Sequence, residues 1–193
     1  MPIRTCRLAT AAVAALTFAM TASADLKSVG TSEINLYLPG GTRGHVVFGK
    51  SSLLVAEQSG RAIAVTAKLD CVTEKQKHTS CFKTGVEMRD KLLWKYLESD
   101  KFPAATLSVE RSQLKIPDDK EKIECDAPGT FSMHGVTRSL GIHYVAKRVG
   151  GNIQIRGQIK INLRDFNLEP PTFYGVHTGT LAEIKVRFNL HAD

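Results

Sequence analysis

The sequence predicts an all-β fold of antiparallel strands with one short helix. The strongest observation is a stretch at residues 152–164, along which apolar and polar residues alternate. Alternation with a period of two puts successive side chains on opposite faces of a strand. Shorter alternating stretches recur along the chain, and glycine- or proline-containing turn signals separate them. A single segment, at residues 86–98, spaces its apolar residues as a helix does.

The longest alternating stretch predicts a strand with one buried face. Its apolar row consists of Ile153, Ile155, Gly157, Ile159, Ile161 and Leu163. Gly157 interrupts this row, at a point where a sharp bend or a bulge would help a sheet to close. Strands with one polar face are typical of antiparallel sheets, in a sandwich or in a barrel. The alternation alone does not choose between those two architectures.

Further strands follow from the same rule. We predict them at residues 33–38, 44–48, 52–57, 63–69, 105–109, 113–116, 130–133, 142–149 and 183–190. Turn signals lie between them at residues 39–41, 59–60, 117–119, 128–129 and 150–151. The result is a chain of many short strands, as expected for an all-β domain.

The predicted helix has an apolar side and a charged side. The apolar side consists of Leu92, Leu93, Tyr96 and Leu97. Thr84 followed three residues later by Glu87 fits a capping box at the start of the helix. Trp94 falls between the two sides, close to Lys91 and Lys95. This combination is compatible with transient contact with a membrane surface, or with a solvated helix that holds one partly packed tryptophan.

The N-terminus has the pattern of a secretory signal peptide. Arg4 and Arg7 precede an apolar run, which the small residues Ala-Ser-Ala close. The run is too short for a transmembrane anchor, which needs roughly 20 apolar residues. We expect cleavage before Asp25, so that residues 1–24 are removed and residues 25–193 form one domain in the periplasm.

The charge of the chain argues against a nucleic-acid partner. The sequence has 26 Lys and Arg residues, of which 24 remain without Arg4 and Arg7, against 19 acidic residues. The excess is mild and spread along the chain, with no basic arm. It is compatible with weak attraction to an anionic membrane or with an ordinary surface of mixed charge.

Three cysteines follow the predicted cleavage site, and none belongs to a C-x-x-C motif. In an oxidising compartment we expect a disulfide between Cys71 and Cys81. Cys125 would then be an odd thiol, either buried or available for a bond to another molecule. Pairing of Cys125 with Cys71 or Cys81 stays open as an alternative.

Four short strings occur in one order along the chain. They are Arg89-Asp90, Phe102-Pro103-Ala104, His134-Gly135-Val136-Thr137-Arg138 and Arg164-Asp165-Phe166. In this order the strings resemble the YceI-like family of periplasmic polyisoprenoid-binding proteins. The string at residues 131–138 is similar to the family's G-x-L-T-x-H-G-V-T-[KR] segment. The resemblance implies an eight-stranded antiparallel β-barrel, lipocalin-like in shape, that holds one long apolar chain. The helix predicted from the apolar spacing could close one end of such a barrel or border its mouth.

The resemblance and the strand pattern together suggest site residues. Candidate ligand contacts are Phe102, Phe131, Met133, His134, Ile155, Ile159 and Phe166. His134 could meet a ligand head group at the barrel mouth, or it could lie in a strand-end turn with its ring bonded to the backbone. Gly135 favours the turn, since glycine permits positive φ. Structural roles are expected for Arg89, Asp90, Arg164 and Asp165, with the two Arg-Asp strings pairing with each other.

Catalysis is not expected. The six histidines have no metal-ligand spacing such as H-x-x-x-H, and no Walker, G-x-S-x-G or G-x-G-x-x-G loop occurs. We therefore predict no enzyme, no cofactor and no metal. A haem or redox partner is a weaker option, for which His143 or a free Cys125 would have to lie inside the barrel.

The sequence thus favours a periplasmic lipid-binding protein that carries or stores an isoprenoid chain, of a quinone or a polyprenyl lipid. Burying one five-carbon unit out of water would contribute roughly 2–4 kcal/mol, at ~0.8 kcal/mol per carbon. This interpretation needs an open apolar tunnel along the barrel. A filled barrel would favour the alternative, a non-catalytic envelope-stress or protein-interaction module. A homodimer is compatible with either.

Overall fold

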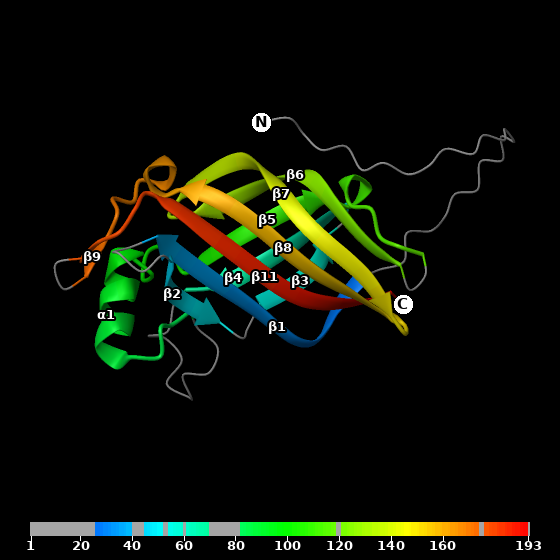
Figure 1. Cartoon of the computed structure of the whole chain (residues 1–193), viewed down its shortest axis with the longest axis horizontal. Coiled ribbons are helices and arrows are strands. Elements are labelled where there is room, and N and C mark those ends of the chain that lie inside the picture. The colour runs from blue at the N-terminus through cyan, green and yellow to red at the C-terminus, as the bar shows by residue number, and fades with distance from the viewer. Residues whose placement is uncertain are drawn as a thin grey trace, which may run out of the picture.

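The strands curl into one antiparallel sheet whose first and last members meet (Figure 1). The computed structural model describes residues 26–39, 45–51, 54–59, 61–69, 82–118, 121–173 and 176–192. The predicted signal peptide at residues 1–24 lies outside the described residues. No helix of the described part is long and apolar enough to cross a membrane.

The main sheet contains nine strand segments. They are β1 (Leu26–Pro39), β2 (His45–Ser51), β3 (Leu54–Ser59), β4 (Ala62–Lys68), β5 (Ala104–Glu110), β6 (Lys122–Met133), β7 (Val136–Val149), β8 (Asn152–Asn162) and β11 (Leu181–Ala192). A separate small hairpin consists of β9 (Thr172–Phe173) and β10 (Val176–His177). The helix α1 spans Glu87–Tyr96, and two 3₁₀ turns, η2 and η3, span Arg111–Gln113 and Leu163–Phe166.

The hydrogen-bonded order closes the sheet on itself. The order is β11-β8-β7-β6-β5-β4-β3-β1-β2, and β11 also pairs with β1. Both β2 and β3 run antiparallel to β1, β2 along residues 34–39 and β3 at Lys27. They therefore act as one interrupted strand, which gives the ring eight strand positions. The predicted eight-stranded antiparallel barrel with one short helix is confirmed.

Burial alternates along the strands in step with the apolar and polar residues of the sequence. Ile153, Ile155, Ile159 and Ile161 of β8 are each at most 4% exposed. The register between β8 and β11 runs without a shift through Gly157 and Val186, so the bulge predicted as one possibility at Gly157 is absent. Gly157 instead makes room for the side chain of Val186, because a Cβ at this position would lie 3.0 Å from a methyl carbon of that valine. Among the described strands, register shifts lie between Val29 and Glu33 of β1 and in β2, which has one extra residue opposite the step from Leu36 to Tyr37.

Two predictions about the β5–β6 region are wrong. The turn predicted at Pro128-Gly129 lies inside β6, opposite residues 140–141 of β7. Gly129 lets the backbone of β5 approach closely, since a Cβ at this position would lie 2.9 Å from the backbone oxygen of Ser108. The strand predicted at residues 113–116 is instead η2 and an irregular segment. The Tyr144 hydroxyl holds that segment by accepting a 2.7 Å hydrogen bond from the backbone N–H of Lys115.

The helix α1 lies at one end of the barrel (Figure 1). Leu93 and Leu97 are buried at 0% and 4% exposure, whereas Leu92 is 45% exposed, so its placement on the buried side is wrong. The predicted capping box is also absent, because the N-cap is Val86 and has no side-chain hydrogen bond. Thr84 instead donates its backbone N–H and its hydroxyl to the buried carboxylate of Asp90. This contact ties the chain before the helix to its first turn.

Candidate ligand-binding site

Inward-facing residues of the described strands line two small apolar cavities inside the barrel. The larger, about 30 Å³, lies toward α1 and is lined by residues that include Leu36, Met133, Ile161 and Leu163. The smaller, about 10 Å³, is lined by residues that include Val65, Leu107, Ile159 and Val186. The side chains around both are almost entirely aliphatic or aromatic, so the interior offers dispersion contacts and few hydrogen bonds.

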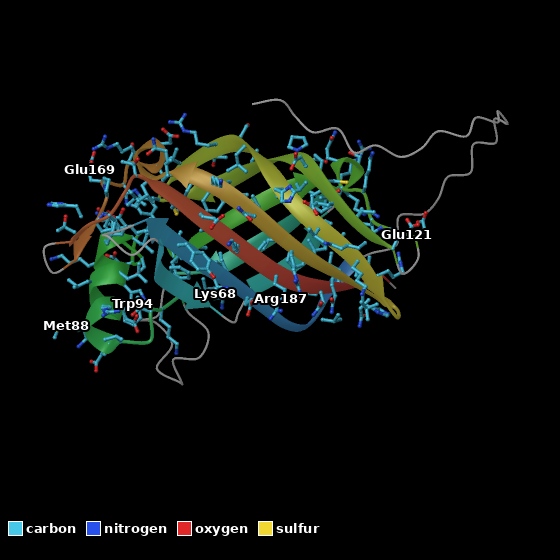
Figure 2. The ribbon with its side chains drawn as sticks, in the orientation of Figure 1. Lys68, Met88, Trp94, Glu121, Glu169 and Arg187 are labelled. Atoms are coloured by element: carbon cyan, nitrogen blue, oxygen red, sulfur yellow. The ribbon has the colours of Figure 1, made fainter. Side chains whose placement is uncertain are left out.

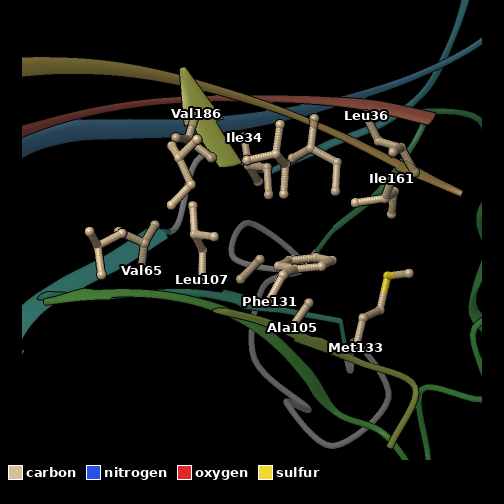
Figure 3. Packing of buried hydrophobic residues seen from close by; sticks show 14 of the residues in the cluster. Ile34, Leu36, Val65, Ala105, Leu107, Phe131, Met133, Ile161 and Val186 are labelled. Atoms are coloured by element: carbon tan, nitrogen blue, oxygen red, sulfur yellow. The ribbon is translucent and has the colours of Figure 1, made fainter. Parts of the chain in front are cut away.

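The ring of Phe131 lies between the two cavities. Both are lined by Phe131, Ile34, Ala105 and Ile184, so they approach each other at these residues. Figure 3 shows the ring in the middle of the interior, with Leu107 on one side and Met133 on the other. Phe131 therefore divides what would otherwise be a continuous apolar space.

The described side chains leave little space in these two cavities. A space of roughly 10–15 Å³ is needed for a single water molecule. Cavities of about 10 and 30 Å³ therefore hold about one and two waters, far less than a prenyl chain. The expectation of an open tunnel is wrong for the described residues in this conformation. Tyr144 and Phe188, both buried in the same core, contribute to the filling.

Five of the seven predicted ligand contacts lie in the core of the barrel. Phe131, Met133 and Ile159 line the cavities. Ile155 is buried in the core at 4% exposure but borders neither of these two cavities. Phe166 lies behind Phe131, with the two rings edge to face at 5.5 Å between centroids.

Phe102 and His134 lie at the turn between β6 and β7, away from both cavities. Their rings are tilted against each other, with 4.5 Å between centroids. His134 and Gly135 have φ of 50° and 73°, and a two-residue hairpin turn of this kind needs positive φ at both positions. Nδ1 of His134 lies 3.1 Å from the backbone oxygen of Phe166 and donates to it, while Nε2 is buried without a hydrogen-bond partner among the described residues. This geometry fits the turn role that the sequence left open beside the head-group role.

Three of the four family strings meet at this turn. His134 bonds to the backbone of Phe166, and Arg138 Nε donates to the backbone oxygen of Asp165 at 3.2 Å. Phe102 packs over Gly135, where a Cβ would lie 2.8 Å from the ring. The strings therefore fix how β6, β7 and η3 come together at the α1 end.

The two Arg-Asp strings do not pair with each other. Asp90 accepts from Thr84, and Arg164 forms an exposed ion pair with Glu169 at 3.2 Å. The expected contact between Arg89-Asp90 and Arg164-Asp165 is wrong, since Arg89 is exposed and Asp165 contributes only its backbone oxygen. Asp90 nevertheless has the structural role that the sequence suggested.

The α1 end of the larger cavity includes residues that the sequence did not single out as ligand contacts. Phe82, Tyr96 and Leu97 all line it. The Tyr96 hydroxyl donates to the backbone oxygen of Glu169 at 2.8 Å, and Trp94 Nε1 donates to that of Phe82 at 2.9 Å. Burial, and next the carboxylate of Glu169, raises the pKa of the Tyr96 phenol. The apolar side of the predicted helix could have indicated Tyr96 and Leu97, whereas no sequence signal pointed to Phe82.

The cysteines and histidines give no redox or metal site in the described part of the chain. Cys125 is 5% exposed and disulfide-bonded, and no described cysteine is free, so the expectation of an odd thiol is wrong. The predicted bond between Cys71 and Cys81 lies outside the described residues. His143 is on the outer face, 2.8 Å from Asp126, so it does not point into the barrel as the haem option requires. Among the described residues no group of three side chains could hold a metal ion.

Comparisons with known proteins agree with this fold. A sequence model described as the YceI-like domain matches residues 10–192. A polyisoprenoid-binding domain from Saccharophagus degradans, implicated in plant cell wall breakdown, has a TM-score of 0.67 at 16% identity, over 89% of this chain and 99% of that one. BcnA of Burkholderia cenocepacia has a TM-score of 0.55 at 13% identity, over 82% and 95% of the two chains.

At such identities a structural likeness shows the fold alone. Comparison with curated protein sequences gives no match. The family match covers nearly the whole chain and includes all four sequence strings. The chain therefore belongs to the YceI-like domain family.

Proposed function

We propose that the protein binds one isoprenoid chain, of a quinone or a polyprenyl lipid, inside its barrel, and that it carries or stores this chain in the periplasm. The observation that carries the proposal is the pair of apolar cavities that approach each other at Phe131. Family membership supports it, as does the likeness to a polyisoprenoid-binding domain. The signal-peptide pattern before Asp25 supports the location.

The chemistry of the interior suits an apolar chain. The lining provides contacts with CH₂ and CH₃ groups and almost no hydrogen-bond partners, so binding depends on length and apolarity. Transfer of one isoprene unit from water contributes roughly 2–4 kcal/mol. A bilayer already keeps the chain away from water, so the net free energy of transfer from a membrane is small. A carrier or a store that exchanges its ligand with membranes needs this balance.

Ligand uptake requires side chains of the filled interior to move. Rotating the Phe131 ring away from Phe166 would lose an edge-to-face contact worth roughly 0.5–1.5 kcal/mol. Met133, on the other side of the ring, is unbranched and adapts its shape readily. For a chain that is taken up from water, one isoprene unit contributes more than the ring contact does, so displacement of Phe131 is then energetically accessible.

We propose binding rather than catalysis as the activity. Two polar side chains beside the α1 end of the cavity are engaged in structural contacts, Tyr96 with Glu169 and Asp90 with Thr84. They hold the turn and the helix in place beside the cavity. The proposed activity needs neither a cofactor nor a metal.

The small cavity volumes favour one alternative. A barrel that stays filled could act through its outer surface, as a non-catalytic envelope-stress or protein-interaction module. Its interior would then serve stability alone. The two functions differ in whether any lipid displaces the core side chains.

Native mass spectrometry of gently purified protein tests the proposal. We expect a 1:1 adduct with an isoprenoid lipid, or uptake of ubiquinone or a polyprenol after removal of bound lipid. Absence of any lipid, together with no uptake, would reject the carrier and favour the interaction module. The same spectra report whether the protein is a monomer or a homodimer, and a mature mass that begins at Asp25 would support the predicted cleavage.

A further inference from the structure

The outward face of α1 carries large apolar side chains. Val86, Met88 and Leu92 are 47%, 63% and 45% exposed. Met88 and Leu92 lie four residues apart, which places them next to each other on one side of the helix. Figure 2 shows Met88 and Trp94 on α1 at the outer end of the molecule. This end therefore presents a small apolar surface to its surroundings.

Two cations without an ion-pair partner among the described residues lie beside that surface. Lys91 is paired with Glu87 at 2.9 Å, so these two charges largely cancel. Arg89 and Lys95 are exposed and form no ion pair within the described part of the chain. Beyond the helix, Glu98 is paired with Lys101. The helix thus combines exposed apolar side chains with uncompensated cations, the combination that suits an anionic lipid surface.

The opposite face of the same helix borders the larger cavity. Tyr96 and Leu97 line that cavity, and Leu93 is fully buried. One helix therefore separates the apolar interior from the exposed apolar surface. A chain that leaves a bilayer beneath α1 would have a short path to the cavity.

We propose that the outward face of α1 docks the protein on the surface of an anionic phospholipid bilayer. The apolar side chains of Met88 and Leu92 enter the interface, and Arg89 and Lys95 contact the anionic head groups. The role of this docking in lipid exchange rests on the function proposed above. The docking itself does not, since it needs only the exposed face.

The sequence supplies a reporter for this face. Trp94 is the one tryptophan of the chain, so intrinsic tryptophan fluorescence reports on α1 alone. Vesicles of phosphatidylcholine with phosphatidylglycerol that carry brominated acyl chains should quench it, whereas vesicles of pure phosphatidylcholine should quench it much less. Raising the salt concentration should weaken the quenching, because exposed charges are screened.

Matched variants locate the docking surface. Leu92→Asp should weaken vesicle binding by at least five-fold, and Arg89→Gln with Lys95→Gln should weaken it by roughly 25-fold, at about five-fold for each lost cation. Val149→Asp is the control, since Val149 is 46% exposed at the far end of β7 and should leave binding unchanged. No binding by the unchanged protein, or equal loss with Val149→Asp, would overturn the proposal.

A second readout separates this proposal from the lipid-binding function. Uptake of a polyprenol from detergent solution, measured by native mass spectrometry, should be the same for Leu92→Asp as for the unchanged protein. Transfer of the same polyprenol from anionic vesicles should be slower for the variant. Vesicle binding without any uptake would retain the docking surface and reject the carrier. Uptake without Trp94 quenching would retain the carrier and reject the docking surface.

Discussion

Replacing Phe131 by alanine should convert the two cavities into one continuous space. The ring lies between them, and its removal leaves no side chain of comparable size at that position. A buried Phe→Ala change lowers the free energy of unfolding by about 3–5 kcal/mol. A domain of this size has roughly 5–15 kcal/mol of stability, so we expect the variant to fold. Urea unfolding measures the loss.

The same change should alter ligand binding in the opposite direction. In the unchanged protein the ligand has to break the edge contact between Phe131 and Phe166, worth roughly 0.5–1.5 kcal/mol. Without the ring that cost disappears, which predicts a Kd lower by roughly two- to twelve-fold. The vacated space also admits about one more isoprene unit, so the preferred chain should lengthen by about that amount.

The assay is a titration of lipid-free protein with polyprenols of increasing length, followed by native mass spectrometry. Phe188→Ala is the matched control, because Phe188 is 4% exposed and borders neither of these two cavities. It should lose similar stability without a change in preferred chain length. Unaltered affinity and chain length in Phe131→Ala, or the same shift in both variants, would refute the reasoning that Phe131 divides the binding space.

Three further predictions concern the scaffold. Gly129→Ala should lower the free energy of unfolding by about 1–3 kcal/mol, because its Cβ would overlap atoms of the neighbouring strands. Gly141→Ala is the control and should not lower it, since the space at its Cβ is open. Urea unfolding measures both variants, and an equal loss of stability in the two would contradict this prediction. Asp90→Ala should lower the free energy of unfolding by about 2–3 kcal/mol, because the Thr84 hydroxyl and N–H lose their acceptor. A double-mutant cycle with Thr84→Ala that shows no coupling energy between the two residues would contradict this. The pKa of the Tyr96 phenol is raised in the folded protein, so its stabilising contribution is present below the ordinary tyrosine pKa of about 10 and is lost as pH rises above that value. Tyr96→Phe should reduce this alkaline loss of stability, and urea melts at neutral and alkaline pH that keep the same difference between the two proteins would contradict the assignment.

The strand pattern was predictable because it is local. In β8 and β11 every second side chain points into the barrel, so the alternation of apolar and polar residues was enough to predict the buried rows that include Ile153 and Ile184. The same rule brought Phe131, Met133 and Ile159 close to the cavities. The choice of a barrel over a sandwich came from the family resemblance, since alternation is the same in both.

The remaining features depend on contacts between residues far apart in the chain. Gly129 looked like a turn because Pro-Gly pairs often form one, but its small size serves the approach of β5 and β7. Thr84 looked like half of a capping box, whereas its acceptor is Asp90, one turn further along. Leu92 looked buried because it is apolar, yet the helix rests on a narrower face around Leu93. No periodicity in the sequence encodes these tertiary choices.

The filled interior likewise could not be read from the sequence. The alternation of the sequence shows which side chains point into the barrel, but not how far they reach across it. The Phe131 ring and the Met133 side chain both come from β6, yet their packing depends on Phe166 in η3 and on residues of β1 and β11. The space left for a ligand is therefore a property of the assembled core.

Methyl NMR of methionine tests the central claim most directly. After cleavage of the predicted signal peptide the chain has two methionines, Met133 at 8% exposure beside the larger cavity and Met88 at 63% exposure on the outside of α1. On titration with a polyprenol in solution, the Met133 methyl signal should shift and show contacts with the prenyl methyl groups, while the Met88 signal should stay in place. Stoichiometric binding that leaves Met133 unchanged, or no binding at all, would contradict the claim that the chain enters the barrel.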